Sequence, residues 1–267
     1  DTWLNRHIKY THGYGVALSK VNTVTESGQP DVLVKNIPPQ SEVKEIDISQ
    51  PRIYFGELTN DYSLVNTSED EFDYPDGSEN KYTQYKGKAG IKLNPFARAM
   101  FAIREGSLKL LVSTNIKSKS KIIIYRNVEE RVKKIMPYLK YEDDPYAVTA
   151  NGRIYWIVDA YTTSSYYPYS EPYGGVEGGT NYIRNSIKVV VDAYNGDVNY
   201  YVVDKKDPIA KTYQKIYPGL FKNMSRMPEE LKSHIRYPNS LFKIQSNIYS
   251  RYHMNNVKVF YQNEDLW

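Results

Sequence analysis

Two short apolar segments with the same ending place the strongest constraint on the fold. Residues 153–161 and residues 187–194 both contain Val-Asp-Ala-Tyr at their ends, and both are rich in β-branched and aromatic side chains, as β-strands are. The pair Asn151-Gly152 precedes the first segment, and the pair Asn195-Gly196 follows the second. Because Asn-Gly accepts the two positive φ values of a type I′ turn, the pattern predicts two hairpins. They join residues 146–149 to 153–160 and residues 187–194 to 198–203.

The rest of the chain mixes predicted strands with predicted helices, without the regular alternation of a doubly wound fold. Apolar spacing and N-cap signals predict helices at 2–12, 94–106, 127–137 and 207–217, and after Pro228 and Pro238, the last with an apolar face. Further strands are predicted at 16–25, 31–35, 108–114 and 117–125, with 51–56 paired to 62–66 and an acidic loop at 69–80. Period-two alternation predicts that Trp156 lies on a buried strand face. We therefore predict an α+β fold, a mainly antiparallel sheet with Asn-Gly hairpins and several peripheral helices. It forms a single domain over residues 1–267, or two lobes that divide near residues 141–145.

Composition excludes several classes of function. The chain has 35 basic and 31 acidic residues spread along its length, which does not favour nucleic acid as a partner. It contains no cysteine, so disulfides, thiolate metal sites and a cysteine nucleophile are excluded. No apolar run approaches the roughly 18 residues that span a bilayer, and the abrupt start at Asp1 is typical of an excised fragment.

The motifs of common enzymes are missing from the sequence, and we predict no catalytic residues. There is no His-Glu-x-x-His, Gly-x-Ser-x-Gly, Walker or Gly-x-Gly-x-x-Gly motif. Asp159 and Asp192 occupy matching places in the two repeated segments, so they are either a general acid–base pair, as in glycoside hydrolysis, or partners of arginines such as Arg153 and Arg184.

Two polar groups invite a metal hypothesis. The acidic segment 69–77 holds Asp70, Glu71, Asp73 and Asp76 before a glycine, and such oxygens suit calcium. The spacing differs from that of an EF-hand, and a solvated loop is the alternative. His7 and His12 are either a metal or acid–base pair, or hydrogen-bonded rings in turns and against tyrosines. We expect no metal and no cofactor.

Tyrosine is the most over-represented residue, with 27 copies against 7 phenylalanines and 3 tryptophans. Many lie between the two predicted hairpins, beside glycines and hydroxyl side chains, where rigid strands would hold an adaptable loop. Tyrosine faces and hydroxyls suit a sugar ring or an extended peptide, and an arginine can hold an anionic group. The alternative is a mobile surface loop whose rings pack on the sheet. The predicted ligand-binding residues are Tyr161, Tyr166, Tyr167, Tyr169, Tyr182 and Arg184.

Lys117, Lys119 and Lys121 alternate along a predicted strand, so their side chains would share one face. They would meet anionic lipid headgroups or an anionic wall polymer, or else protect an edge strand against aggregation.

Several motifs in a fixed order resemble one family over the whole chain. They include Tyr10-Thr-His-Gly-Tyr-Gly15, Gln50-Pro-Arg-Ile-Tyr-Phe-Gly-Glu57, Glu71-Phe-Asp-Tyr-Pro75, Asn181-Tyr-Ile-Arg-Asn-Ser186 and His234-Ile-Arg-Tyr-Pro238. The chain resembles the bacterial uncharacterised protein family 0182 of predicted membrane proteins. The resemblance implies several N-terminal membrane helices followed by a large extracytoplasmic region, of which this chain is a part. Its location would then be the extracytoplasmic side of the cell membrane, with its own membrane helices as partners. The resemblance implies no activity.

Three functions therefore remain open. The first is a non-catalytic extracytoplasmic domain of a multi-pass membrane protein that binds a ligand, an envelope polymer or a protein partner. The second is a hydrolase acting on a cell-envelope polymer, which requires a buried carboxylate pair with room for substrate. The third is an assembly module in which exposed strands and tyrosines form an oligomer interface.

Overall fold

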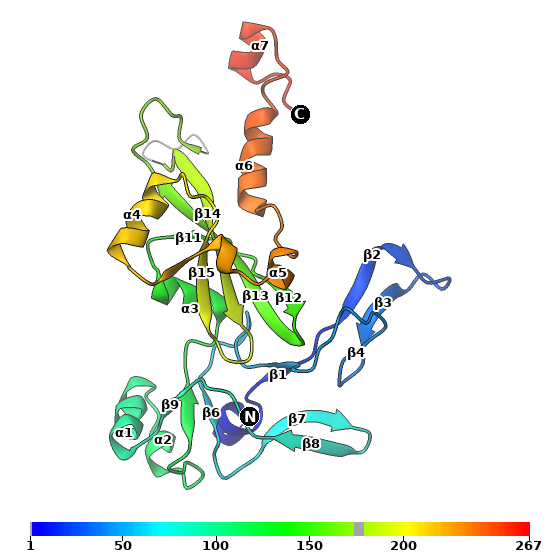
Figure 1. Ribbon diagram of the computed structural model, residues 1–267, viewed down its shortest axis with the longest axis vertical. Helices are drawn as coiled ribbons and strands as arrows, with labels where there is room; N and C mark the ends of the chain where they lie inside the picture. Colours follow the sequence, from blue (N-terminus) through cyan, green and yellow to red (C-terminus); the bar gives the residue numbers. More distant parts are fainter. Residues whose placement is uncertain (1, 174–178) are drawn as a thin grey trace. The chain divides into compact units, whose positions relative to one another are not determined.

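The computed structural model describes residues 2–173 and 179–267, which form two compact units (Figure 1). Unit 1 contains residues 1–134, 147–156 and 191–198, and unit 2 contains residues 135–146, 157–190 and 199–267. The chain therefore enters each unit more than once. The fold is α+β with mostly antiparallel sheets and several short helices, as predicted from the sequence.

The largest sheet has six strands and contains both predicted hairpins. Its order is β11-β13-β14-β15-β16, with β12 paired to β13. β11 is antiparallel to β13, and β16 is parallel to β15. The strands are β11 (Lys140–Tyr141), β12 (Tyr146–Ala150), β13 (Arg153–Ser164), β14 (Tyr182–Asp192), β15 (Val198–Val202) and β16 (Phe221–Asn223).

The two Asn-Gly turns differ in conformation. Asn151 and Gly152 both have positive φ, 50° and 72°, as the type I′ prediction requires. In the second turn only Gly196 has positive φ, because the side chain of Asp192 accepts hydrogen bonds from the amides of Tyr194 (2.8 Å) and Asn195 (3.0 Å) and shapes a longer loop.

The remaining strands form four small sheets in unit 1. They pair β1 (Gly13–Tyr14) with β5 (Arg52–Ile53), β2 (Leu18–Val24) with β3 (Pro30–Lys35) and β4 (Gln40–Ser41), β10 (Lys121–Ile123) with β6 (Ser63–Val65) and β9 (Ile91–Lys92), and β7 (Glu71–Asp76) with β8 (Glu79–Thr83). The predicted pairing of 51–56 with 62–66 is therefore wrong. The predicted acidic loop at 69–80 is also wrong, because it is the β7–β8 hairpin and its carboxylates at Glu71 and Asp73 point into the protein.

Two helices of unit 1 contribute side chains to a hydrophobic core cluster. α1 (Pro95–Arg104) begins as predicted, with the Asn94 side chain accepting a hydrogen bond from the Ala97 amide at 2.8 Å. α2 (Lys109–Val112) replaces a predicted strand, because a short apolar run suits either structure. The core contains Ile8, Leu64, Leu93, Phe101, Ala102, Leu110, Ile116 and Ile122. Residues 117–120 form a turn, closed by a 3.0 Å hydrogen bond from the Ser120 amide to the Lys117 carbonyl, so the three lysines do not share a strand.

The other helices mostly begin where the sequence predicts. The helix predicted at 2–12 includes η1 (Asn5–Lys9). α3 (Val128–Ile135) follows Asn127, whose side chain accepts a hydrogen bond from the Glu130 amide. Asp207 caps α4 (Pro208–Ile216), and α5 (Glu229–Lys232) and α6 (Asn239–Tyr249) follow prolines. η3 (Met224–Arg226) and α7 (Val257–Gln262) complete the set. On α6 only part of the predicted apolar face is covered, since Ile244 is buried and Ile248 is exposed.

The central strand β13 is buried on both faces along residues 157–162. Side chains that point to opposite sides of the strand, such as those of Ile157 and Val158, are therefore both buried. Trp156 is half-buried, and its indole Nε1 donates to the Phe55 carbonyl at 2.9 Å. Among the described residues, no helix has the length and apolar character that crossing a bilayer requires.

Candidate functional site

The predicted tyrosine segment begins where β13 ends, at Ser164, and returns to the sheet where β14 begins, at Tyr182. Asn181 holds its two ends together. The Asn181 amide donates to the Ser164 carbonyl at 3.0 Å, its Oδ1 accepts from the Tyr167 amide at 3.0 Å, and its Nδ2 donates to the carbonyls of Tyr167 (2.9 Å) and Ser170 (3.1 Å). The backbone around Tyr167 is therefore positioned by hydrogen bonds.

Two rings extend into solvent from this base. Tyr166 is 93% exposed and Tyr169 is 109% exposed. Tyr169 also has a φ of +56°, a left-handed conformation that a bulky side chain rarely adopts. Strained residues of this kind cluster at binding sites, and the bonds from Asn181 to the neighbouring carbonyls stabilise this one.

Behind these rings, two further tyrosines form a stack. Tyr167 lies on Tyr182 with ring centroids 5.4 Å apart and an interplanar angle of 20°. The Tyr182 hydroxyl donates to Asp207 Oδ1 at 2.9 Å. Burial and this carboxylate together raise the pKa of Tyr182 to about 12, so its hydroxyl stays protonated at neutral pH. We call Tyr166, Tyr167, Tyr169 and Tyr182 the tyrosine ledge.

Asp207 anchors the ledge from below. It is fully buried at the N-terminus of α4, and its carboxylate accepts from the hydroxyls of Ser186 (2.5 Å) and Thr162 as well as Tyr182. Burial would raise the pKa of Asp207, but these hydrogen bonds outweigh it and lower the pKa. The result is a rigid charged support for one end of the stack.

Arg184, predicted to hold an anionic group, already has a carboxylate partner. Its Nη1 lies 3.2 Å from Asp204 Oδ2, and its guanidinium lies 5.8 Å from the Tyr182 ring centroid. Arg184 therefore supports the Tyr182 ring, and a ligand anion would have to compete with Asp204.

Tyr161 does not belong to the ledge. It is 1% exposed, and its hydroxyl donates to Glu142 at 2.5 Å. Tyr161 is thus covered by the protein at this position of β13, unlike the exposed rings of Tyr166 and Tyr169. Tyr173 is 45% exposed, and its amide donates to the Thr180 carbonyl at 2.8 Å. Gly174, Gly175 and Gly178, predicted to make the loop adaptable, lie outside the described residues.

The two aspartates of the repeated segments each have a cation. Asp159 pairs with Lys188 in the interior of unit 2, where both side chains are under 5% exposed. Asp192 lies 2.7 Å from Arg153, as one of the sequence-based alternatives states. These contacts therefore give no support to Asp159 and Asp192 as a pair of carboxylates facing one substrate.

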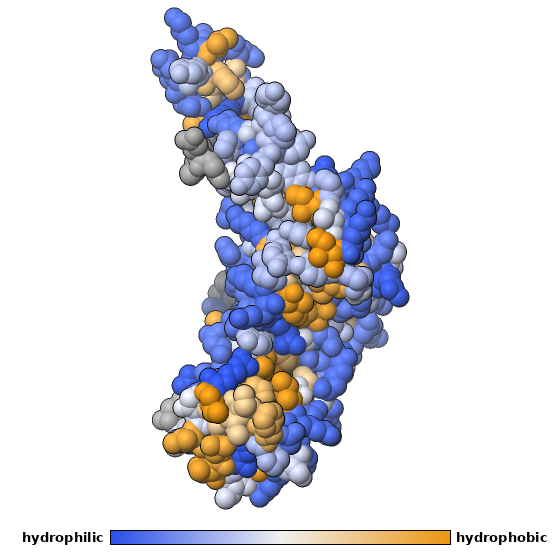
Figure 2. Space-filling view, turned by 90° about the vertical axis from the view of Figure 1, so that its left-hand side faces the viewer, coloured by the Kyte–Doolittle hydropathy of each residue, from blue (hydrophilic) through white to orange (hydrophobic). Residues whose placement is uncertain are grey.

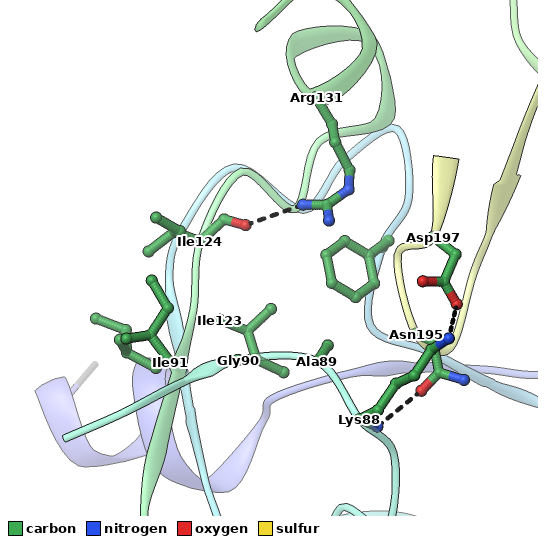
Figure 3. A pocket seen from close by; sticks show the side chains of 11 residues that line it. Lys88, Ala89, Gly90, Ile91, Ile123, Ile124, Arg131, Asn195 and Asp197 are labelled. Carbon is green, nitrogen blue, oxygen red and sulfur yellow. Dashed lines mark hydrogen bonds and ion pairs between the residues drawn. The ribbon is translucent and has the colours of Figure 1, made fainter. Parts of the chain in front are cut away.

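Unit 1 has a cavity of about 370 Å3 that sequence analysis did not indicate (Figure 3). Ile91, Ile123 and Ile124 lie on one side, and Lys88 and Asp197 lie on another with their charged atoms 2.9 Å apart. Arg131, which extends from α3 toward this space, donates from Nε to the Gly196 carbonyl at 2.7 Å and lies 4.6 Å from the Phe55 ring centroid. The charged groups around the cavity are therefore engaged by the protein itself.

The candidate metal ligands lie apart or have other partners. Asp70 accepts from Gln84, and Asp76 pairs with Lys81. His7 stacks on Tyr62 and bonds to its carbonyl at 2.9 Å. Within residues 2–173 and 179–267, no group of three or more histidine and carboxylate side chains is placed to hold a metal ion.

A buried cluster in unit 1 joins the remaining candidates. Asp73 accepts two hydrogen bonds from Arg52, at 2.7 and 2.5 Å, and lies 3.2 Å from His12 Nε2. Glu71 accepts from the Tyr54 hydroxyl at 2.7 Å and lies 3.6 Å from His12 Nδ1. The side chains of His12, Glu71 and Asp73 are 4% exposed or less. We call these five residues the carboxylate–histidine cluster.

Comparison with known proteins identifies the family. The model of "Uncharacterised protein family (UPF0182)" matches residues 1–267. The chain belongs to this family. It is 54% identical over 267 residues to UPF0182 proteins of Clostridium acetobutylicum and Clostridium botulinum, and 54% identical to one of Alkaliphilus metalliredigens. Each match covers the whole of this chain. The chain spans only 28–29% of the length of those relatives. No solved structure matches the chain.

In this UPF0182 chain, three of the motifs behind the resemblance meet in the carboxylate–histidine cluster. His12 comes from the first motif, Arg52 and Tyr54 from the second, and Glu71 and Asp73 from the third. The sequence singled out His12, Glu71 and Asp73 as candidate metal ligands, but it predicted a loop and not a strand for the two carboxylates. Strict alternation of Glu71, Phe72, Asp73 and Tyr74 was the signal that could have placed both carboxylates on one strand face.

Proposed function

We propose that this chain is a non-catalytic binding domain on the extracytoplasmic side of a longer membrane protein, and that it recognises a carbohydrate polymer of the cell envelope. The tyrosine ledge is the binding surface. The observation that carries the proposal is the pair Tyr166 and Tyr169, two almost fully exposed rings on a hydrogen-bonded base, one of them held in a strained conformation.

Exposed aromatic rings suit the apolar faces of sugars because burying a ring against them removes apolar surface from water without leaving unpaired polar groups. Preorganisation supports the same conclusion. A ring whose backbone is already fixed loses little conformational freedom on binding, so more of the contact energy contributes to affinity. Asn181 supplies that fixation for Tyr167, and Asp207 supplies it for Tyr182.

The ledge lacks the features of a catalytic centre. The carboxylate that Tyr182 contacts, Asp207, is buried and accepts four hydrogen bonds, from Thr162, Ser186, Tyr182 and the Ile209 amide. A carboxylate so engaged has neither the raised pKa of a general acid nor access to a substrate. The hydrolase alternative has no comparable observation in its favour.

The test is a pull-down of the purified chain with insoluble peptidoglycan, with and without its attached anionic polymers. The double variant Tyr166→Ala, Tyr169→Ala should lose most of the binding, on the order of tenfold or more, since each ring contributes roughly 1–2 kcal/mol. Both rings are exposed, so the melting temperature should stay nearly unchanged.

Tyr249→Ala is the matched control, because Tyr249 is 70% exposed on α6 of the same unit. It should bind like the unchanged chain. Equal binding by the ledge variant and the control would refute the ledge as the site. If binding requires the anionic polymers and the ledge variant still binds, the binding site is a basic surface and not the ledge.

A further inference from the structure

α1 in unit 1 is apolar on two opposite faces, and only one of them is covered. Phe101 and Ala102 face the core and are 8% and 5% exposed. Phe96, Met100 and Ile103 follow at helical spacing on the other side and are 76%, 50% and 76% exposed. Large apolar side chains gathered on an exposed face mark an interaction site, so the outer face of α1 needs a partner.

The next segment extends this face. Leu108, which precedes α2, is 76% exposed, and Leu111 and Val112 on α2 are 43% and 74% exposed. Gly106 has a φ of +60° and lets the chain turn from one helix to the next. Figure 2 shows apolar surface gathered over this part of unit 1. We call Phe96, Met100, Ile103, Leu108, Leu111 and Val112 the apolar face.

The surroundings of the apolar face carry a strong positive charge. Between residues 92 and 121 the only acidic residue is Glu105, and it pairs with Arg104 at 3.4 Å. The same stretch has seven basic residues, namely Lys92, Arg98, Arg104, Lys109, Lys117, Lys119 and Lys121. The whole chain is nearly balanced, at 35 basic to 31 acidic residues, so the excess is local to this helix pair and its flanks.

We propose that the apolar face docks on the surface of an anionic lipid bilayer. Large apolar side chains beside lysines and arginines are the pattern of helices that lie in a membrane interface, with the apolar face about 5–10 Å into the headgroup boundary. Each lysine or arginine near an anionic surface adds about 1 kcal/mol of attraction. The exposed Lys109, Lys117 and Lys119 supply such charges beside the apolar side chains.

A second copy of the chain is the less suitable occupant. A two-fold symmetric dimer brings a surface against its own copy, which would place two basic surrounds against each other with one acidic residue on each side. An anionic bilayer covers the same apolar area and neutralises the charge. This inference does not depend on the tyrosine ledge, which lies in unit 2.

The test is flotation of the purified chain with vesicles. The chain should float with an equal mixture of phosphatidylcholine and phosphatidylglycerol, and at least tenfold less with phosphatidylcholine alone. Binding should weaken between about 0.1 M and about 1 M salt, as the Debye length falls from about 10 Å to about 3 Å. Lys117→Gln with Lys119→Gln should weaken binding to the anionic vesicles about tenfold or more.

Phe96→Ser with Ile103→Ser should abolish flotation on either vesicle. The matched control is Val21→Ser with Val24→Ser on β2 of the same unit, where the side chains are 103% and 69% exposed. This control should float normally. Failure of the unchanged chain to bind anionic vesicles, or equal binding by both double variants, would overturn the proposal. So would a dimer in solution that only the Phe96 and Ile103 substitutions dissociate.

Discussion

Replacing Asp73 by asparagine should destabilise unit 1 by about 3 kcal/mol. The substitution keeps the shape of the side chain but removes a charge that Arg52 contacts through two hydrogen bonds and His12 through one. Breaking a buried ion pair by neutralising one partner costs roughly 3–5 kcal/mol. We take the lower end, because the Arg52 side chain is 24% exposed and asparagine retains one acceptor oxygen.

Asp76→Asn is the control on the same strand. The Asp76 carboxylate is 57% exposed and pairs with Lys81, which is 45% exposed. Exposed pairs of this kind contribute about 0–1 kcal/mol. Urea unfolding followed by tryptophan fluorescence measures both variants, since Trp3 and Trp156 lie in unit 1. A loss near 3 kcal/mol corresponds to a fall in melting temperature of about 6–12 °C.

The cost of Asp73→Asn should also depend on pH. Burial lowers the pKa of His12, but hydrogen bonds to Asp73 and Glu71 outweigh it and raise the pKa, so this stabilisation is complete below about pH 6.5 and is lost as pH rises through the folded value. Burial raises the pKa of Asp73, but the contacts with His12 and Arg52 outweigh burial, so the net effect is a lowered pKa. The stabilisation that ionised Asp73 gives the fold is therefore complete above about pH 3.9 and is lost as pH falls through the folded pKa.

The difference between the unchanged chain and the variant should therefore be greatest between about pH 4 and pH 6.5 and should shrink on both sides. Equal destabilisation by Asp73→Asn and Asp76→Asn would refute the argument. A difference that stays constant from pH 3 to pH 8 would refute the assigned role of His12.

Two further substitutions test the packing of each unit. Gly196→Ala should destabilise unit 1 by about 2–5 kcal/mol, because a Cβ atom there would lie 2.4 Å from Phe55 Cζ. Gly77→Ala is the control: it has a similar φ of 62° and no atom within 4 Å of the added Cβ, so it should cost only the left-handed strain of about 1–2 kcal/mol. Equal losses of stability in urea unfolding would contradict the predicted clash with Phe55. Lys188→Met should destabilise unit 2 by about 3–5 kcal/mol by leaving Asp159 buried without its cation, and adding Asp159→Leu should restore most of the loss.

Local signals along the chain predicted much of the fold. Both hairpins follow from Asn-Gly pairs, and the starts of α1 and α4 follow from Asn94-Pro95 and Asp207-Pro208. These signals act over a few residues, so no distant contact is needed to recognise them. Long-range pairing was not predictable in the same way. Whether 51–56 pairs with its neighbour or with β1 depends on contacts that no local pattern encodes.

The charged hairpin β7–β8 shows a second limit of prediction from sequence, which is that a single sequence does not reveal buried charges. Carboxylates are usually exposed, and this tendency led to the predicted loop at 69–80. The interior accepts Glu71 and Asp73 only because Arg52, His12 and Tyr54 reach them from other parts of the chain. A single sequence shows the residue types but not which of them meet.

In the candidate site, too, the sequence indicated the segment but not which of its tyrosines are exposed. Tyr161 and Tyr166 are five residues apart and chemically identical, yet one is 1% exposed and the other 93% exposed. Their difference arises from where β13 ends, which local signals locate only to within a few residues. Tyrosine enrichment therefore identified the segment, and the strand end decided which rings face solvent.

The carboxylate–histidine cluster and the two surfaces that suit a partner are made of different residues. In the carboxylate–histidine cluster, the carboxylates accept hydrogen bonds from the side chains of Arg52 and Tyr54, and the carboxylates and His12 are buried. The apolar face and the outer rings of the ledge, Tyr166 and Tyr169, have the opposite character, because these side chains are exposed. Their chemistry also differs: the ledge in unit 2 consists of hydroxylated rings, and the apolar face in unit 1 consists of side chains without hydroxyl groups, among lysines. Envelope carbohydrate and lipid vesicles should therefore respond to separate sets of substitutions, and a variant that loses one binding activity should keep the other.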